Sequence, residues 1–253
     1  MDFKVGDLVT RISHNNDIIF KITNIDNDIC YLKGEFIRLS ADSNINDLIH
    51  YNDENKEEKE FEERLYDDKL NLRDEYFYLP GKILHIDGDI DYLNKCLDYY
   101  KKINIWAKGI FNKEEDISLN IKDYLEEYNP NIVVITGHDA FYKKDSTYKN
   151  SDNFIKAIKE ARKYEKSHEK LIIIAGACQS NYEELIKAGA NFASSPKRIN
   201  IHALDPAIVA SKLSLSSISE DINLKEILDK TKYGSKGMGG IVTKGTMHIG
   251  YPR

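Results

Sequence analysis

The sequence predicts an α/β protein with a doubly wound, mainly parallel sheet, preceded by a small β module. Two apolar runs, residues 131–135 (Asn-Ile-Val-Val-Ile) and 171–175 (Leu-Ile-Ile-Ile-Ala), are rich in β-branched residues and do not alternate with polar ones. Such runs are typical of strands buried on both faces. From residue 79 to about 218 they alternate with helical patterns, which favours a parallel sheet with right-handed crossovers.

Residues 1–50 are expected to form the small β module, as an SH3-like barrel. Its strands are predicted over 5–11, 18–25 and 29–39, and Asn27-Asp28 is typical of a hairpin tip. Residues 51–78 are densely charged and are predicted to form a connector or solvated helix that carries Arg64 and Arg73. The third part, 79–253, is the predicted catalytic domain.

The elements of this third part are predicted from periodicity, caps and breakers. The predicted strands are 82–89, 105–110, 131–138, 171–178 and 191–194, and the predicted helices are 92–102, 117–128, 153–168 and 182–188, with another opened by Asp205-Pro206. Residues 141–150 are predicted to be a polar loop. Thr243-Lys244-Gly245 is interpreted as a hairpin in the tail.

Composition sets limits on partners and cofactors. The chain has 253 residues, is 41% hydrophobic and 31% charged, and carries a net charge of −6, which gives no reason to expect nucleic acid. No run approaches the roughly 18 apolar residues of a membrane span, and the first residues lack an apolar signal region, so we expect an intracellular protein. Three widely spaced cysteines without metal-ligand spacing predict neither disulfides nor a metal or other cofactor.

The two apolar runs each end in one reactive residue, His138 and Cys178. Consecutive strands of a parallel sheet usually pair, so we expect both residues at the same carboxyl edge, where open α/β folds place their sites. A turn of small residues is expected to lift Cys178 clear of the sheet, with a helix N-terminus following. That terminus favours the thiolate and offers N–H groups to an oxyanion, while His138 acts as base and then acid.

Carboxylates at the same edge are candidates for orienting the imidazole or binding a basic substrate side chain. Asp87 and Asp89 end the first strand of the sheet, and Asp139 follows His138 directly. Each could also bind a cation or be a solvated or capping carboxylate.

A later polar loop adds two more candidates. His202 is expected in a pocket wall. Asp205 is a substrate-binding candidate as well, although a role as helix N-cap is the preferred interpretation.

Several longer segments resemble the YabG family of sporulation-specific proteases of endospore-forming bacteria. The segments are Val5-Gly6-Asp7, 79–82, 85–89, 135–140, 176–180, 188–196, 201–206 and Gly239-Gly240-Ile241. The resemblance implies a cysteine endopeptidase of the mother-cell cytoplasm that processes spore coat and germination proteins, cutting after Arg and acting through Cys178 and His138.

More distantly, the arrangement is similar to the caspase and clostripain group, which implies a caspase-like fold. Those proteases place Gly after the catalytic His and use its N–H for the oxyanion. Here Gly137 precedes His138 and Asp139 follows it, so the N–H of Cys178 remains the natural donor.

The leading hypothesis is therefore a Cys-His endopeptidase in which one of the four aspartates holds the substrate Arg. A second hypothesis is an amidotransferase-like hydrolase, in which His202 or His248 would replace His138. A third is a non-catalytic coat protein. The first hypothesis also predicts that the enzyme cuts its own connector at Arg64 or Arg73.

Overall fold

The computed structural model describes residues 3–51, 56–66 and 73–252. The chain divides into two compact units, Met1–Glu62 and Glu63–Arg253. Within the charged stretch, α1 spans Lys56–Tyr66, while 52–55 and 67–72 lie outside the described residues. The division into a module, a connector and a catalytic domain at 50 and 78 stays a prediction.

The first unit is built on a five-stranded antiparallel sheet of order β4-β3-β2-β1-β5. The strands are β1 (Leu8–Arg11), β2 (Phe20–Asp26), β3 (Ile29–Gly34), β4 (Ser40–Asn44) and β5 (Leu48–His50), with short 3-10 turns at Ile12–His14 and Ile45–Asp47. Asp26 pairs with Ile29, so the hairpin predicted at Asn27-Asp28 is confirmed. A small core lies on one side of this sheet; it consists of Val9, Phe20, Ile22, Cys30, Leu32 and Leu48.

The single strand predicted over 29–39 is wrong in its second half. The chain reverses after Gly34, whose N–H bonds to the carbonyl of Leu39 at 2.7 Å, and β4 then returns beside β3. A Cβ on Gly34 would lie 2.2 Å from the carbonyl oxygen of Ile37. Only glycine allows this close approach.

The second unit contains a six-stranded sheet of order β14-β13-β12-β9-β7-β8. Its strands are β7 (Ile83–Asp87), β8 (Ala107–Phe111), β9 (Ile132–Thr136), β12 (Ile172–Ala175), β13 (Phe192–Ser194) and β14 (Met238–Gly240). The first five are parallel, and β14 is an antiparallel edge strand. The mainly parallel sheet is therefore confirmed.

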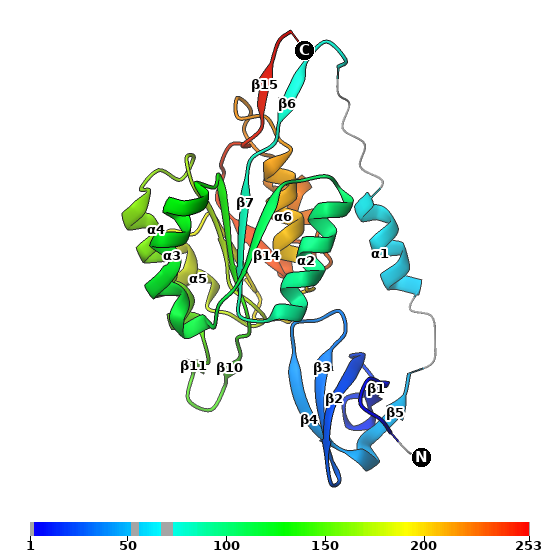
Figure 1. Cartoon of the computed structure of the whole chain (residues 1–253). Helices are drawn as coiled ribbons and strands as arrows, with labels where there is room; N and C mark the ends of the chain where they lie inside the picture. The colour runs from blue at the N-terminus through cyan, green and yellow to red at the C-terminus, as the bar shows by residue number, and fades with distance from the viewer. Residues whose placement is uncertain (1–2, 52–55, 67–72, 253) are drawn as a thin grey trace. The chain divides into compact units, whose positions relative to one another are not determined.

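Helices cover both faces of this sheet (Figure 1). They are α2 (Ile90–Lys102), α3 (Glu114–Tyr128), α4 (Ser151–Tyr164), α5 (Tyr182–Ala188), α6 (Asp205–Ser214) and α7 (Leu224–Asp229), with a 3-10 turn at Gly234–Lys236. On one face α3 and α4 pack on each other, and with α5 they contact the strands; on the other, α2 lies on β7 and β8, and α6 on β9 and β12. Every residue of β7, β9 and β12 is buried, which explains the absence of polar alternation.

The strand order defines a switch point. The chain runs from β7 through α2 to β8 on one side, and then crosses to β9 on the other side of β7. Adjacent connections therefore leave β7 and β9 in opposite directions. In open α/β sheets, ligands bind at such a point, outside the carboxyl ends of the strands.

Two predicted boundaries were wrong for identifiable reasons. α3 begins at Glu114 rather than 117, because three acidic residues form a first turn that suits a helix N-terminus. α4 ends at Tyr164 rather than 168, since the carbonyls of Glu165 and Ser167 accept hydrogen bonds from Arg162 instead of continuing the helix.

The predicted tail hairpin is also wrong. β14 joins the large sheet, whereas β15 (His248–Gly250) pairs with β6 (Phe77–Leu79) in a separate two-stranded ribbon. A Cβ on Gly245 would lie 2.0 Å from the carbonyl oxygen of Ser216. Gly245 therefore serves a close backbone approach to that segment, which a turn signal does not distinguish from a hairpin.

Candidate active site

Asp89, His138 and Cys178 occupy equivalent positions on three neighbouring strands. Ile135 on β9 pairs with Ile86 on β7 and with Ala175 on β12. Each of the three candidate residues comes three positions after its member of that row. The shared register therefore brings a carboxylate, an imidazole and a thiol to the carboxyl edge of β7, β9 and β12, on both sides of the switch point.

The carboxylate and the imidazole are in direct contact. Oδ2 of Asp89 lies 2.8 Å from Nε2 of His138, and both side chains are largely buried. Oδ1 of Asp89 accepts the N–H groups of Asp91 and Tyr92, so Asp89 also caps α2. An ionised carboxylate only accepts, so the network assigns the proton to Nε2 and the lone pair of neutral His138 to Nδ1.

The backbone around His138 is held from several sides. Its N–H donates to Oε1 of Glu114 at 2.7 Å, and its carbonyl accepts from Nδ2 of Asn150 at 2.8 Å. A Cβ on Gly88 or Gly137 would lie 2.4 Å from the Glu114 carboxyl group, so both glycines make room for it. The ring of Tyr92 meets the imidazole edge-on, with centroids 5.7 Å apart.

Cys178 lies three residues beyond the end of β12 and is buried, with 0% exposure. Its Sγ accepts the N–H of Ile201 at 3.3 Å and lies 3.8 Å from the Ile201 carbonyl oxygen, to which the thiol can donate. The following helix, α5, begins only at Tyr182, and residues 179–181 form a turn between them. The N–H that contacts the sulfur therefore comes from the 195–204 loop.

Gln179, next to the thiol, adopts the left-handed conformation with φ of 57°. Its side chain accepts the N–H of Phe141 and donates to Oδ1 of Asn200, while its own N–H lies within hydrogen-bond reach of the Ile199 carbonyl and the Ser195 hydroxyl. Gln179 therefore connects the loop after His138 with the loop after β13. Non-glycine residues in this conformation are strained and persist only where the surroundings fix them.

The predicted polar loop contains a small hairpin, β10 (Phe141–Tyr142) and β11 (Thr147–Tyr148). Tyr148 accepts a hydrogen bond from Nε of Arg198 at 2.8 Å, and the same guanidinium pairs with Glu183 on α5. Burial disfavours the charge of Arg198, but these partners outweigh it and raise its pKa. The hairpin, the 195–204 loop and α5 are thus joined beside the candidate site.

The carboxylate of Asp139 is fully engaged inside the protein. Oδ1 accepts the N–H groups of Ala140 and Asn150, and Oδ2 accepts the hydroxyls of Ser151 and Ser180. Asp139 is 5% exposed. These contacts favour an internal role over substrate binding.

Asp87 is also buried and bonded. It accepts the N–H of Asp89 and the hydroxyl of Thr136, both at 2.9 Å, and lies 3.6 Å from Nε2 of His85. His85 in turn contacts the hydroxyls of Thr136 and Tyr100 at 3.0 Å. Asp87 therefore belongs to a polar network beneath α2 that also fixes the turn carrying Asp89.

Asp205 does not act as the helix N-cap that was preferred from the sequence. Leu204 occupies that position, and Asp205 is the first residue of α6. Its carboxylate accepts the N–H groups of His202 at 3.0 Å and Lys232 at 2.8 Å. Pro206 follows directly and has no N–H to cap, and the carboxylate turns back to the preceding loop instead.

The two alternative histidines are poorly arranged as bases. Nδ1 of His202 accepts the N–H of Leu204 at 3.1 Å, so a neutral His202 carries its proton on Nε2 and has no lone pair left for a thiol. His248 lies on β15. That strand pairs with β6, which precedes β7, so His248 lies toward the amino edge of the sheet.

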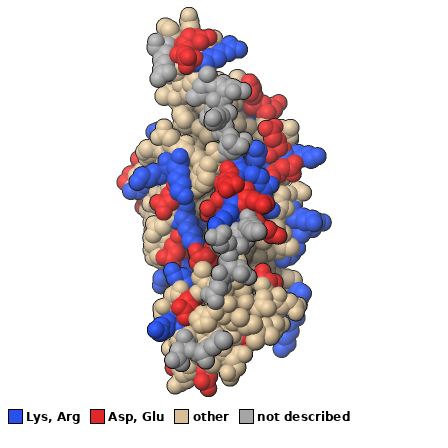
Figure 2. Space-filling view, turned by 90° about the vertical axis from the view of Figure 1, so that its right-hand side faces the viewer, with Lys and Arg blue, Asp and Glu red and all other residues tan. Residues whose placement is uncertain are grey.

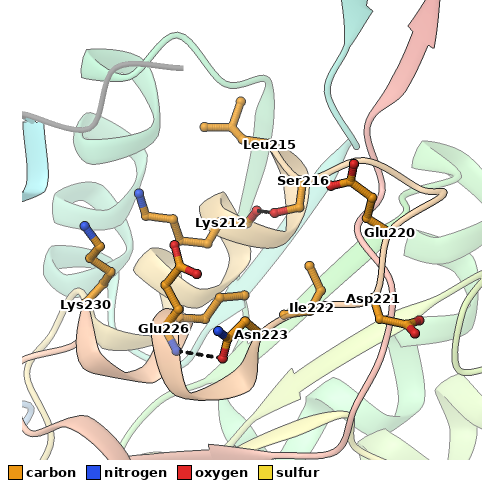
Figure 3. Close-up of a pocket in the computed structure, with 10 residues that line it drawn as sticks. Lys212, Leu215, Ser216, Glu220, Asp221, Ile222, Asn223, Glu226 and Lys230 are labelled. Carbon is orange, nitrogen blue, oxygen red and sulfur yellow. Dashed lines mark hydrogen bonds between the residues drawn. The ribbon is translucent and has the colours of Figure 1, made fainter. Parts of the chain in front are cut away.

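A separate hollow of about 350 Å³ lies beside α6 and α7 (Figure 3). Its lining mixes charged side chains of both signs, among them Lys212, Glu220 and Glu226, with the apolar side chains of Leu215, Ile222 and Ile227. It lies near the end of α6 where Ser214 bonds to Gly81, just before β7, and thus toward the amino edge of the sheet. It contains none of the candidate catalytic residues.

The surface and the remaining side chains add little to this site. On the face shown in Figure 2, basic and acidic side chains are interspersed rather than gathered by sign. Among the residues that the structure describes, no three His, Cys, Asp or Glu side chains are grouped as metal ligands would be. No helix in the same described part is long and apolar enough to span a bilayer.

The fold and the site together define an α/β protein with a thiol, an imidazole and a carboxylate in one row at the switch point of its sheet. The model of the family described as YabG peptidase U57 matches residues 4–72 and 53–252. The chain is 41% identical to the sporulation-specific protease YabG of Bacillus subtilis (strain 168), over 100% of this chain and 99% of the relative. The chain therefore belongs to the YabG peptidase family.

Among solved structures, a GDP-L-fucose synthetase from Naegleria fowleri aligns with 58% of this chain and 44% of its own, at 16% identity and a TM-score of 0.26. This likeness is too low to carry an argument about the fold.

Sequence reasoning missed several residues that build the site. Glu114 and Asn150 contact the turn of His138, and Ile201 contacts the sulfur of Cys178. Ser151 contacts both turns, and Ser180 joins its own turn to Asp139. Gly88 and Gly137, each next to a candidate residue in the sequence, were the available signal, since a glycine can indicate that another group approaches the backbone closely. They do not identify the partner, which comes from the first turn of α3.

Proposed function

We propose that this peptidase is a cysteine endopeptidase in which Cys178 is the nucleophile, His138 the general base and acid, and Asp89 the residue that orients the imidazole. The observation that carries the proposal is the common register of the three residues, together with the 2.8 Å contact between His138 and Asp89. Membership of a peptidase family favours this reading over the amidotransferase and coat-protein alternatives.

In the proposed reaction, Nδ1 of His138 takes the thiol proton and the Cys178 thiolate attacks the scissile carbonyl carbon. The imidazolium then protonates the leaving amine, and a thioester remains. His138 next removes a proton from water while the water oxygen attacks the thioester carbon. The C–S bond then breaks, the carboxylic acid leaves, and His138 returns the proton to the sulfur. Asp89 stabilises the imidazolium through Nε2, as the carboxylate of a catalytic triad does.

The contacts of Sγ with Ile201 belong to the resting thiol in this proposal. The Ile201 N–H that faces the sulfur would stabilise a thiolate by a hydrogen bond, whereas the carbonyl of the same residue accepts from the neutral thiol. Substrate takes the place of this peptide unit beside the sulfur, and the N–H of Cys178 serves as an oxyanion donor. We propose a caspase-like fold for the second unit, which the positions of His138 and Cys178 at neighbouring strand ends support. For the first unit we propose an SH3-like barrel.

We propose further that the enzyme cuts after Arg in spore coat and germination proteins of the mother cell. Of the four candidate carboxylates we assign the Arg to Asp205, because its segment includes Ile201, which contacts the nucleophile. At rest Asp205 is buried and accepts the N–H groups of His202 and Lys232, so in this proposal the guanidinium replaces these donors when the Ile201 segment moves aside. Asp89 and Asp139 are bonded to His138 and to two serines, and Asp87 supports the Asp89 turn. A guanidinium would meet Asp205 through charge-assisted hydrogen bonds.

The test is cleavage of a peptide substrate with Arg before a fluorogenic amide by purified full-length protein. Cys178→Ala and His138→Ala are expected to reduce kcat by at least about a thousandfold, as removal of a triad member does in other hydrolases. His202→Ala is the matched histidine control and is expected to retain at least a tenth of the activity. If His202→Ala abolished cleavage while His138→Ala did not, the assignment of His138 would be wrong.

The specificity part has its own measurement. Asp205→Asn should lower kcat/KM for Arg substrates more than for matched Gln substrates, because only the charged side chain loses an ion pair. Asp87→Asn is the control for the Arg-to-Gln ratio, since this carboxylate supports the Asp89 turn and does not belong to the Ile201 segment. An unchanged Arg-to-Gln ratio in Asp205→Asn would remove Asp205 from the substrate site.

A further inference from the structure

We infer that Asp139 is a positioning residue that holds the turn of Cys178 against the turn of His138, and that it does so through hydrogen bonds from Ser180 and Ser151. This inference rests on the proposed function, since it concerns the geometry of the Cys178 and His138 pair. Asp139 follows His138 directly and is 5% exposed. Because Asp139 follows the proposed base directly, its other contacts determine how the base is positioned.

Both hydroxyls act as relays with a defined direction. Ser180 Oγ accepts the N–H of Ala177 at 2.9 Å and donates to Oδ2 of Asp139 at 2.8 Å. Ser151 Oγ accepts the N–H of Asn181 at 2.8 Å and donates to the same oxygen at 2.5 Å. A hydroxyl has one proton, so once it donates to the carboxylate it can only accept from the backbone N–H, which fixes the direction of each relay.

The two backbone groups at the far ends of these relays flank the nucleophile. Ala177 precedes Cys178 directly, and Asn181 is the residue before α5. Both ends of the five-residue turn 177–181 are therefore bonded, through one hydroxyl each, to the carboxylate beside His138. The turn itself includes the left-handed Gln179, which needs such support to persist.

The other carboxylate oxygen fixes the histidine side. Oδ1 of Asp139 accepts the N–H of Ala140 at 2.9 Å and of Asn150 at 2.7 Å, and Asn150 also bonds to the His138 carbonyl. Asp139 thus closes the loop after β9 with one oxygen and ties it to the turn after β12 with the other. Catalytic geometry of this kind must be held to a fraction of an ångström, and buried charge-assisted hydrogen bonds can do so.

The test uses full-length Asp139→Asn and Ser180→Ala. In Asp139→Asn, an NH₂ group replaces one of the two carboxylate oxygens. That NH₂ group would face either the two serine hydroxyls or the two backbone N–H groups, all of which are donors, so the present network cannot form. We expect kcat to fall by about ten- to a hundredfold in each variant, with KM changed by less than about threefold, since misplacement of reacting groups acts on the chemical step.

The second measurement is alkylation of Cys178 by iodoacetamide between pH 5 and 9, followed peptide by peptide because Cys30 and Cys96 are also present. Cys178 is buried at rest, so the reagent reaches it through the same movement of the Ile201 segment that the proposed function requires. In the wild-type enzyme the imidazole should keep alkylation faster than in His138→Ala at the acidic end of this range. We expect both variants to lose that acidic portion of the profile and to approach the profile of His138→Ala. A residue that only stabilised the fold would not change it.

Ser214→Ala is the matched control. Ser214 is equally buried, and its hydroxyl donates to the Gly81 carbonyl at 2.7 Å, before β7 and away from the candidate site. It should lower the unfolding temperature to a similar extent but leave kcat and the alkylation profile unchanged. Ser180→Ala provides a milder lesion should Asp139→Asn fail to fold.

Wild-type kcat and alkylation in both variants would overturn the inference while leaving the proposed function intact. A wild-type enzyme without cleavage activity, whose Cys178 profile matched that of His138→Ala, would instead refute the proposed function, and the inference with it. A loss of kcat in Ser214→Ala as large as that in Ser180→Ala would also overturn the inference, because it would show that destabilisation alone lowers kcat.

Discussion

Asp89 bonds to His138 with one carboxylate oxygen and caps α2 with the other. The contact from Oδ2 to Nε2 is 2.8 Å, and Oδ1 accepts the N–H of Asp91 at 2.9 Å. The orientation of the imidazole is thereby fixed by the same side chain that begins a thirteen-residue helix. A rigid element thus supports the proposed base.

Asp89→Asn should separate these two functions of the residue. Asparagine is as good a helix cap as aspartate, so the free energy of unfolding should change little. The amide can present a donor to Nε2 and favour the wrong tautomer, so kcat should fall by about 10²- to 10⁴-fold. Steady-state kinetics and urea unfolding measure both quantities. Asp91→Asn, two residues further along the chain, is expected to keep wild-type kcat. A loss of kcat in Asp91→Asn equal to that in Asp89→Asn would contradict the explanation.

Gly137→Ala should impair the site by displacing Glu114. The new Cβ would lie 2.4 Å from Oε1 and 2.8 Å from Cγ of Glu114, so this side chain must move away from the His138 N–H. We expect a drop in kcat of at least about tenfold, as small misplacements of reacting groups produce.

The double variant Gly137→Ala with Glu114→Ala tests this cause. Removal of the Glu114 side chain relieves the clash, so the two substitutions should be less than additive in their effect on unfolding temperature. Strict additivity would mean that the cost of Gly137→Ala has another origin.

Arg162→Met should destabilise the second unit by about 2–4 kcal/mol, because several buried carbonyl and amide oxygens would lose a charged donor. The guanidinium donates to Gly189, Leu171 and the side chain of Asn191 at 2.6–2.8 Å, and its burial lowers its pKa to about 10. Urea unfolding measures the change. Lys163→Ala, which removes an exposed pair with Glu160, serves as the neighbouring control and should have little effect.

Stability should fall when the pH drops below about 6.5, the ordinary value for histidine. Burial, and then the charge of Arg162, lower the pKa of His168 in the folded protein. The unfolded chain then binds a proton that the folded protein does not, so the stabilisation is complete above the unfolded pKa and is lost as the pH falls toward the folded one. Chemical unfolding at pH 8 and pH 5.5 should show this loss. His168→Gln should reduce the difference between the two values, and an undiminished difference would assign it to other groups.

Wild-type enzyme should cut its own chain at Arg73 in preference to Arg64. Arg73 is exposed and precedes β6, whereas Arg64 lies within α1, and a protease requires its substrate to be extended. Mass spectrometry after incubation should find a fragment that begins at Asp74. Equal fragmentation of wild-type and Cys178→Ala protein would exclude self-cleavage, and Arg73→Gln should remove this product alone.

The parallel sheet was predictable from sequence because its strands are buried on both faces. Their apolar runs are long and uninterrupted, and the helices between them carry clear caps, such as Asp89 before α2 and Gly189 after α5. The edge strand β14 was not predictable in the same way, since Met-Gly-Gly carries no periodicity and its pairing with β13 depends on contacts from distant parts of the chain.

The site was predictable only in outline. Strand register placed His138 and Cys178 at one edge, and Asp89 was among several aspartates there. The sequence could not rank these aspartates, because the choice depends on where each carboxylate turns. Asp139 turns toward serines on α4 and before α5, and Asp205 toward the backbone of the preceding loop. Burial of the thiol by Ile201 has no local signal at all.

The ribbon of β6 and β15 has a consequence for a chain cut at Arg73. Its strands pair Phe77 with Gly250 and Leu79 with His248, so the first strand after the cut is paired with β15. The fragment 74–253 would retain all six strands of the large sheet and all three residues of the proposed triad. In that fragment β6, close to the new amino end, would keep its pairing with β15, so removal of the first unit would leave this end anchored by a β-ribbon.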